Sequence, residues 1–155
     1  MLDRFDRALL DHVQRDDSRT ADELAASVPL SPSAIARRLR RLRADGFIAT
    51  TIALLSAKLT RDRLRALVLI QLNEHADLER KNTLEQHLLA TAEVQFCYDI
   101  SGPHDMAVFL DCSNMADFNA RTDELLVSSP AVRRFETHFI KREVKFAPFV
   151  AMTTE

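Results

Sequence analysis

Apolar side chains recur at helical spacing in the first part of the chain, and this pattern predicts short helices. The first helix runs from Leu2 to Arg15, with Asp3 placed to cap its start. Thr20 and Glu23, three residues apart, form a capping box that begins a second helix. Each helix has one apolar side, formed by Phe5, Leu9 and Val13 in the first helix and by Leu24 and Val28 in the second. We therefore expect the two helices to bury these sides against a common core.

A third helix has clear signals at both ends. Ser31 can cap its start, and Pro32 fits the first helical position, where no backbone donor is lost. Gly46 can take the left-handed conformation that ends a helix, and we expect Phe47 to fold back onto Leu42 as in a Schellman motif. The signals place one helix between Pro32 and Gly46.

The third helix separates an apolar stripe from a basic face. Its apolar stripe consists of Ile35, Leu39 and Leu42. Five arginines lie within seven residues, with no carboxylate on the helix for i,i+4 pairing; they are Arg37, Arg38, Arg40, Arg41 and Arg43. A solvated arginine face is one interpretation. The other is a polyanion-binding helix, because a helix N-terminus also attracts phosphate.

Two short helices joined by a tight turn, the second of them basic, are typical of a helix-turn-helix that places its second helix in the DNA major groove. Three helices followed by Phe47 and Ile48 indicate the winged form. We expect Arg37 and Arg41 to face the DNA and Arg38 and Arg40 to assist from the sides. The candidate DNA-binding residues are Ser31, Ser33, Arg37, Arg38, Arg40 and Arg41.

The remainder of the chain alternates between strand and helix patterns. Residues 49–63 look extended and predict a strand-like connector. Strands are then expected at 66–72, 94–100, 105–112 and 132–146, and helices at 78–92 and after Asn114. This βαββαβ order is that of a ferredoxin-like domain, in which two helices cover one face of the sheet. We expect a second copy of the chain to cover the other, apolar face.

The sequence thus predicts an α+β protein in three parts: a winged helix-turn-helix domain at 1–49, a connector at 50–64 and a βαββαβ domain at 65–155. Of its 155 residues, 46% are hydrophobic, which suffices for real cores. The first 60 residues hold ten Arg and Lys against eight Asp and Glu, whereas the rest hold eleven against fifteen. Positive charge is therefore local, which suits docking through one element and argues against indiscriminate nucleic-acid binding.

Several classes of function find no support in the sequence. No apolar run has the length of a membrane span, and the N-terminus lacks a signal peptide, so a cytoplasmic protein without a membrane partner is expected. Cys97 and Cys112 lie in apolar surroundings without metal-ligand spacing, which predicts buried free thiols and no metal. No cofactor is expected.

Taken together, several short segments make the whole chain resemble the Lrp/AsnC, or feast/famine, family of transcriptional regulators. They are Leu2-Asp3 with Asp6, Leu30-Ser31-Pro32, the basic run 37–42, Gly46-Phe47-Ile48, Ala53-Leu54-Leu55, Ile100-Ser101-Gly102 and Glu143-Val144-Lys145. The resemblance implies a winged helix-turn-helix followed by a RAM/ACT-like βαββαβ domain. It also implies dimers that often assemble into tetramers or octamers, and regulation by a small effector, usually an amino acid.

The chain departs from the family pattern in two places. Pro29 stands where the family usually has a glycine in the turn, so this turn must be built differently. The effector loop keeps only the glycine and the second acid of the family pattern. The resemblance implies that the effector site consists of Gly102, Pro103, His104, Asp105, Met106 and Thr137. A plain hairpin turn is the alternative interpretation of the loop.

The leading hypothesis is a sequence-specific DNA-binding transcriptional regulator, not an enzyme, whose partners are double-stranded DNA, a second copy of the chain and a small effector. One alternative is an enzyme, because a few relatives decarboxylate sirohaem-type tetrapyrroles, and His104, Asp105 and His138 would then be acid–base groups. Another is an effector-binding module that has lost DNA binding, which Pro29 keeps open.

Overall fold

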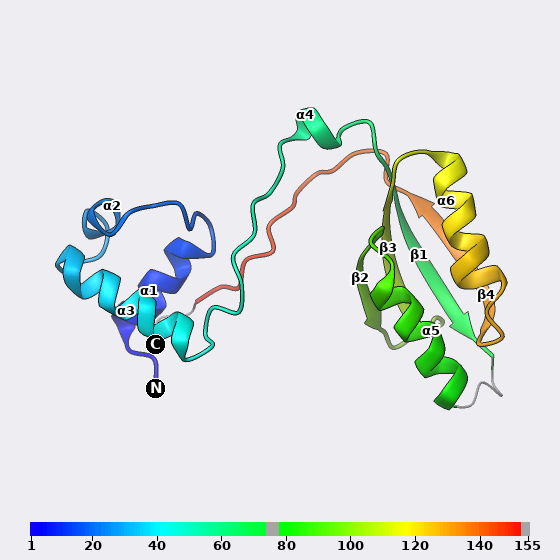
Figure 1. Ribbon diagram of the computed structural model, residues 1–155, viewed down its shortest axis with the longest axis horizontal. Coiled ribbons are helices and arrows are strands. Elements are labelled where there is room, and N and C mark those ends of the chain that lie inside the picture. The colour runs from blue at the N-terminus through cyan, green and yellow to red at the C-terminus, as the bar shows by residue number, and fades with distance from the viewer. Residues whose placement is uncertain (74–77, 153–155) are drawn as a thin grey trace. The chain divides into compact units, whose positions relative to one another are not determined.

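The structure is a computed structural model that describes residues 1–73 and 78–152, and the chain forms two compact units (Figure 1). The first unit is Met1–Leu54 together with the C-terminal segment from Lys145, and the second is Leu55–Val144. Each unit has its own apolar core.

The first unit contains the three predicted helices, α1 (Arg4–Val13), α2 (Ala21–Ala25) and α3 (Pro32–Ala44). Their apolar sides meet in one core, whose fully buried members are Leu9, Leu24, Val28, Ile35 and Leu42. The helix α1 is shorter than predicted because Asp3 is the N-cap and the helix ends at Val13.

The predicted capping box of α2 is present, and the predicted cap Asp3 forms a second one with Asp6 at the start of α1. The Asp3 carboxylate accepts the backbone N–H of Asp6 at 2.8 Å, and the Asp6 carboxylate accepts the N–H of Asp3 at 3.2 Å. In α2 the Glu23 carboxylate accepts the N–H of Thr20 at 2.7 Å, and the Thr20 hydroxyl accepts the N–H of Glu23 at 3.3 Å. These bonds satisfy donors that a helix start would otherwise leave without partners.

The end of α3 is a Schellman motif, as predicted. Gly46 has φ of 77°, and the N–H of Phe47 donates to the carbonyl of Leu42 at 2.9 Å. Phe47 is 50% exposed, however, and it is Ile48 that packs against the core.

The turn between α2 and α3 needs no left-handed residue, which explains how it accommodates Pro29. Within the described residues, only Gly46 and Gly102 have positive φ. Val28 is 1% exposed and anchors the turn in the core, while the N–H of Leu30 donates to the Val28 carbonyl at 2.7 Å.

The connector is not the strand that the sequence predicted. No strand forms across residues 49–63, and α4 (Ala57–Thr60) is a single helical turn. Ile52, Leu54 and Leu55 are exposed, so their apolar character does not reflect burial within a sheet. An extended segment becomes a strand only when another strand pairs with it.

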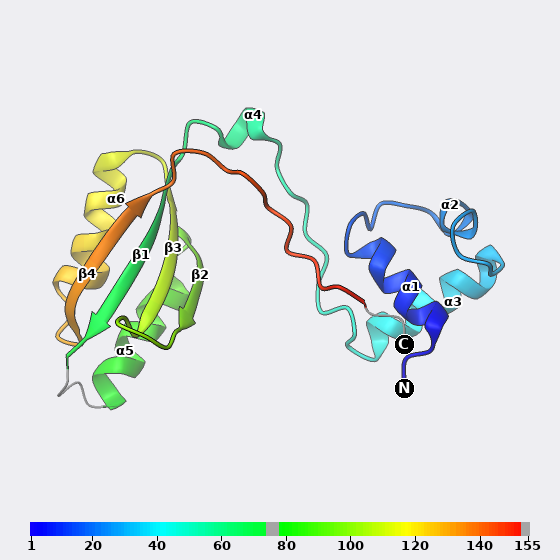
Figure 2. The same cartoon turned by 180° about the vertical axis from the view of Figure 1, so that it is seen from behind.

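The second unit has the predicted βαββαβ order. Its elements are β1 (Leu64–Leu72), α5 (Leu78–Ala90), β2 (Val94–Asp99), β3 (Met106–Cys112), α6 (Met115–Thr122), a π-helical turn η1 (Asp123–Val127) and β4 (Val132–Phe139). The antiparallel sheet has the order β2-β3-β1-β4. Figure 1 shows α5 and α6 in front of the sheet, and Figure 2 shows the sheet in front of the helices, so both helices cover one face.

The covered face forms the second core. Ala66, Val68 and Ile70 of β1 are fully buried there and pack with side chains of both helices. Cys112 is buried and Cys97 is half-buried, both as free thiols, and burial raises the pKa of each. The final strand ends at Phe139 rather than at Phe146, because its pairing partner β1 has its first residue at Leu64.

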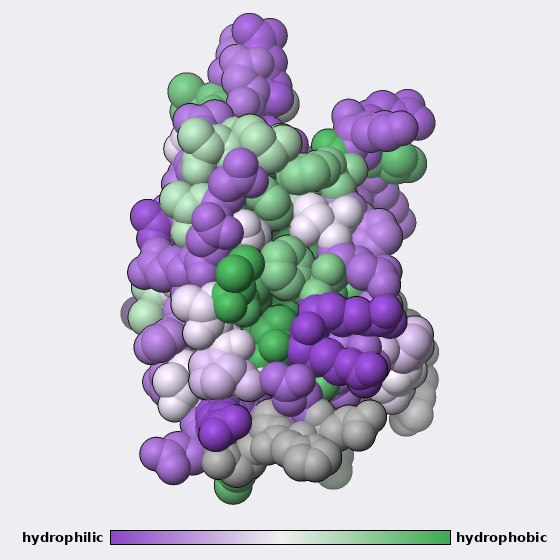
Figure 3. All heavy atoms as spheres, turned by 90° about the vertical axis from the view of Figure 1, so that its right-hand side faces the viewer, coloured by the Kyte–Doolittle hydropathy of each residue, from purple (hydrophilic) through white to green (hydrophobic). Residues whose placement is uncertain are grey.

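The other sheet face carries apolar side chains that no helix covers. Leu67 and Leu69 alternate with the buried residues of β1, and Leu67 pairs with Phe109 of β3. The ring of Phe109 stacks on that of Phe96 with centroids 5.1 Å apart, and Phe96 lies 5.3 Å from Tyr98. Figure 3 views the molecule from the right-hand side of Figure 1, not onto this face, and there too apolar side chains gather in the middle of the surface with polar ones around them.

The C-terminal segment packs with the first unit, whereas the prediction assigned it to the second. The Gln14 side chain exchanges two hydrogen bonds with the backbone of Val150, at 2.8 and 2.9 Å. The Arg15 guanidinium lies 5.5 Å from the ring centroid of Phe149, and Met152 packs against the first core. Among the described residues, no helix is long and apolar enough to cross a membrane.

Candidate DNA-binding surface and ligand loop

The outward side of α3 presents a polar and basic stripe. Ser33, Arg37 and Arg40 are spaced i, i+4 and i+7, are all exposed, and lie on the side away from the buried Ile35 and Leu42. Across residues 1–73 and 78–152, neither arginine forms an ion pair. Their guanidinium groups are therefore available to an external anion.

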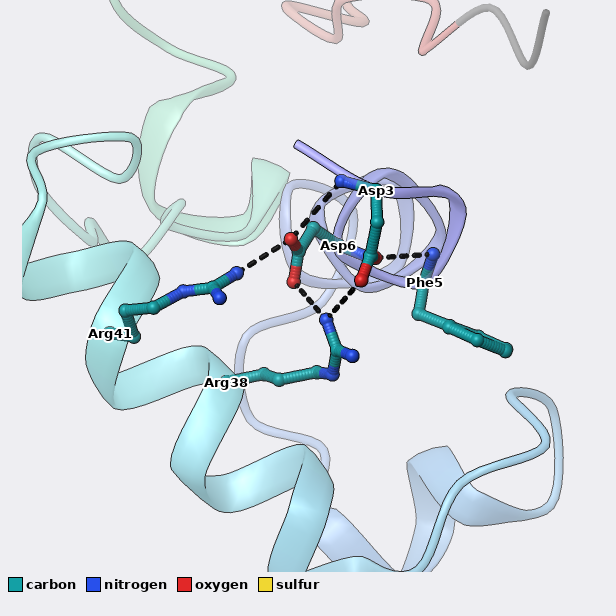
Figure 4. A network of polar contacts seen from close by, with 5 residues as sticks. All are labelled: Asp3, Phe5, Asp6, Arg38 and Arg41. Atoms are coloured by element: carbon teal, nitrogen blue, oxygen red, sulfur yellow. Dashed lines mark hydrogen bonds and ion pairs between the residues drawn. The ribbon is translucent and has the colours of Figure 1, made fainter. Parts of the chain in front are cut away.

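Two other arginines of α3 are held by carboxylates at the start of α1 (Figure 4). One terminal nitrogen of Arg38, Nη1, donates to Asp3 Oδ2 at 2.7 Å and to Asp6 Oδ1 at 2.8 Å. Arg41 Nη2 donates to Asp6 Oδ2 at 2.6 Å. Asp6 is 1% exposed, so the carboxylate that the two arginines share is buried between α1 and α3.

Hydrogen bonding favours the charged forms of Asp3 and Arg38 in this network. The backbone N–H of Asp6, with further help from Arg38, lowers the pKa of Asp3. Asp6 and Asp3, in that order, raise the pKa of Arg38. Each of these bonds favours the ionised form of Asp3 or Arg38.

The last arginine of the basic run is also paired. Arg43 Nη2 donates to Asp17 Oδ1 at 2.6 Å, and the Thr51 hydroxyl donates to Asp17 Oδ2 at 2.9 Å. Asp17 lies in the loop after α1, and Thr51 lies in the segment after α3. The two hydrogen bonds to Asp17 therefore connect the end of α3 with both segments.

These contacts refine the sequence prediction. The helix α3 has no carboxylates of its own, as the sequence shows, but the preceding elements supply three of them. The spacing of Asp3 and Asp6 matches that of Arg38 and Arg41, three residues in each case, and this matched spacing is the signal that sequence reasoning missed. It becomes meaningful only once α1 packs on α3.

The start of α3 offers further donors. Ser31 caps the helix by accepting the N–H of Ala34 at 3.3 Å, and its hydroxyl lies 3.2 Å from that of Ser33. Both serines are exposed. Hydroxyls at a helix N-terminus are suited to phosphate oxygens.

The predicted effector loop is the turn between β2 and β3. Gly102 has φ of 133°, a conformation that side chains rarely adopt, so glycine is needed there. The N–H of Ile100 donates to the carbonyl of Asp105 at 2.9 Å and closes the turn. Gly102 and Pro103 are exposed at its tip.

Asp105 has a structural contact within this turn. Its backbone N–H donates to the carbonyl of Ile70 at 2.9 Å, and its Oδ2 accepts the N–H of Leu72 at 2.8 Å. The register of β1 with β3 ends at Ile70 opposite Met106, and Leu72 lies beyond it. Asp105 therefore satisfies a backbone donor at the end of β1.

The remaining candidate effector residues differ in burial and in the face of the sheet on which they lie. The His104 side chain is 11% exposed, and its Nε2 lies 3.5 Å from Glu136 Oε1. Met106 is 1% exposed in the core. Thr137 pairs with the buried Val68 and shares the helix-covered face with it, so it does not join the loop residues on one surface.

The fold and the basic stripe define a helix-turn-helix DNA-binding protein with a separate ligand-binding domain, and family comparisons agree. Residues 2–49 match a winged helix-turn-helix DNA-binding domain, and residues 65–148 match the Lrp/AsnC ligand-binding domain. The chain belongs to the Lrp/AsnC family and is a ligand-responsive transcriptional regulator.

Relatives align along nearly the whole chain. The leucine-responsive regulatory protein of Escherichia coli is 34% identical over 146 residues, which cover 93% of this chain and 87% of that protein. An uncharacterised helix-turn-helix regulator of Sinorhizobium fredii is 31% identical over 145 residues, covering 93% and 85%.

Solved structures confirm the fold. A transcriptional regulator of Neisseria meningitidis in complex with L-methionine superposes with a TM-score of 0.86 at 25% identity, covering 96% of this chain and 95% of that one. An AsnC family regulator from Agrobacterium tumefaciens superposes with a TM-score of 0.85 at 23% identity, covering 96% of both chains.

Proposed function

We propose that α3 binds a specific DNA sequence in the major groove through the stripe of Ser33, Arg37 and Arg40. The observation that carries this proposal is that both arginines are exposed and form no ion pair within the described part of the chain. Arginines of this kind read guanine edges with two donors at once. Ser31 and the half-exposed Arg41 lie beside the stripe and suit the phosphate backbone.

The experiment that tests this proposal is a mobility-shift titration with the duplex upstream of the gene that encodes the chain, against a scrambled duplex of equal length. Preferential binding of the upstream duplex supports specific recognition. Equal binding of both duplexes contradicts it, and no binding favours an effector-binding module without DNA affinity.

A dimer formed through the uncovered sheet face completes this function. One short basic helix offers few base contacts, and two copies would read paired half-sites about 34 Å apart or a multiple of that distance. The stacked rings of Phe96 and Phe109, next to Leu67 and Leu69, supply the apolar surface that a second copy would bury. Larger assemblies such as octamers remain compatible with this dimer.

We infer that the ligand is an amino acid bound at the turn of residues 102–105. The Neisseria relative binds L-methionine, which gives the ligand class. Asp105 uses Oδ2 for Leu72, and its Oδ1 accepts no hydrogen bond from the described residues, which leaves this oxygen for an ammonium group. Gly102 lets a ligand carboxylate approach the backbone. Met106 and Thr137 do not contribute side chains to this surface.

We assign no acid–base chemistry to the three residues of the enzyme alternative. His104 lies against Glu136, Asp105 binds the backbone of Leu72, and His138 pairs with Leu67 on the uncovered sheet face. The family is one of transcriptional regulators, which agrees with this inference.

A further inference from the structure

The buried carboxylate of Asp6 is a feature of α1 that bears directly on α3. Its side chain is 2% exposed, and each oxygen accepts a hydrogen bond from a different arginine of α3, Arg38 on Oδ1 and Arg41 on Oδ2. Figure 4 shows the two guanidinium groups converging on it from one side. Two arginines of the basic helix thus share one anchor.

The two arginines differ in how much of their guanidinium group faces solvent. Arg38 is 22% exposed at its side chain, bonds Asp3 as well as Asp6, and lies 5.7 Å from the ring centroid of Phe5. Arg41 is 49% exposed, and a single terminal nitrogen of its guanidinium binds Asp6. A guanidinium has five N–H donors in a rigid plane, so Arg41 keeps donors that face solvent.

We propose that Asp6 is a positioning residue for DNA binding and acts through Arg41, by orienting its remaining donors toward a DNA phosphate. The inference rests on the proposed binding of DNA by α3. A flexible arginine loses side-chain entropy when it binds, and a carboxylate that holds its guanidinium in advance reduces that loss. Asp6 would then strengthen binding at the position along the DNA in which Arg41 meets a phosphate.

If Asp6 acted only through its negative charge, it would weaken DNA binding instead of strengthening it. A carboxylate near DNA repels phosphates, so its neutralisation strengthens binding to every sequence. A purely structural role would weaken the fold and lower binding to all sequences alike. Positioning alone predicts weaker binding to the specific site with unchanged or stronger binding to other DNA.

The experiment compares wild type with Asp6→Asn, which removes the charge and keeps the side-chain shape. The specific probe is a duplex that the wild-type protein enriches from a random-sequence pool, and the non-specific probe is its scrambled version. We expect the affinity for the enriched duplex to fall about tenfold, which is about 1.4 kcal/mol. The affinity for the scrambled duplex should stay the same or rise.

Asp11→Asn is the matched control. Asp11 lies on the same helix and pairs with Arg15 at 3.0 Å, away from α3, so its loss changes the net charge equally without releasing an arginine of the basic helix. We expect it to leave the ratio of specific to non-specific affinity unchanged. A ratio that falls equally in both variants would overturn the proposal.

A double-mutant cycle connects the effect to Arg41. In an Arg41→Ala background, Asp6→Asn should cause no further loss of specific affinity, because the two residues act as a unit. Full additivity would overturn the proposal. If Asp6→Asn does not fold, Arg41→Lys tests the proposal in its place. This substitution keeps the positive charge but removes the planar guanidinium with its several donors. Wild-type specificity in Arg41→Lys would contradict the proposal.

The proposed DNA function fails in a distinguishable way. If the wild-type protein enriches no duplex from the pool, DNA binding by α3 is refuted. If the wild type enriches a duplex and the Asp6→Asn ratio equals that of wild type, only the positioning role is refuted.

Discussion

At the scale of single residues, the arginines of α3 divide by their partners. Arg37 and Arg40 are exposed and unpaired in the part of the chain that the structure describes, whereas Arg38 is tied to two carboxylates. The division was not apparent in the sequence, where all five arginines have the same chemistry.

We expect Arg37→Ala and Arg40→Ala each to weaken specific DNA binding by about 1–3 kcal/mol while leaving the melting temperature unchanged. Arg38→Ala should instead lower the free energy of unfolding by about 2 kcal/mol, less than for a fully orphaned buried charge because Asp6 keeps Arg41. Fluorescence anisotropy and thermal melts measure the two effects. A large stability loss in Arg37→Ala would contradict the division.

Asp105 combines a structural contact through Oδ2 with an Oδ1 that accepts no hydrogen bond from the described residues, and two substitutions separate these two roles. Asp105→Ala should lose the bond to Leu72 and about 1 kcal/mol of stability, whereas Asp105→Asn keeps an acceptor and most of the stability. Both should lose the rise in melting temperature that an amino-acid ligand gives the wild type by mass action. A thermal-shift screen of the common amino acids measures this, and an undiminished rise in Asp105→Asn would place the ligand elsewhere.

At the scale of elements, the carboxylates of the capping boxes make the stability of α1 and α2 depend on pH. Hydrogen bonds lower the pKa of Asp3 from its ordinary value of 3.8 and that of Glu23 from 4.5, with the backbone N–H of Asp6 and Thr20 as the respective main causes. A lowered pKa in the folded state adds stability that is present above the ordinary value and is lost as the pH falls through the folded value.

We therefore expect the melting temperature to fall as the pH is lowered from about 6 to about 3. Glu23→Gln retains an acceptor for the Thr20 N–H but does not titrate, so its melting temperature should fall less steeply with acid. Thermal melts followed by circular dichroism across this range provide the measurement. A slope identical to that of wild type would show that the capping box of α2 does not contribute.

At the scale of the whole molecule, we propose that the uncovered sheet face forms the dimer interface. Phe109→Arg places a charge among the stacked rings of that face and should convert a dimer to a monomer, with a loss of specific DNA affinity. Leu89→Arg is the control, because Leu89 is 76% exposed on α5. Light scattering at micromolar concentration measures the mass, and a Phe109→Arg dimer would refute this interface.

The sequence by itself determined the elements whose signals are local. Caps at Asp3, Thr20 and Ser31 and the stop at Gly46 depend on bonds between residues a few positions apart, and apolar periodicity reports directly which face is buried. The order of strands and helices along the chain followed from the same patterns.

Only the tertiary structure determined which partner each functional side chain has within the chain. Arg41 and Asp6 are 35 residues apart, Asp105 and Leu72 are 33 apart, and Gln14 and Val150 are 136 apart. Met106 and Thr137 were assigned to the ligand site by resemblance, yet their register in the sheet turns them toward the helices. Such pairings follow from how elements pack, and no local pattern of residues specifies them.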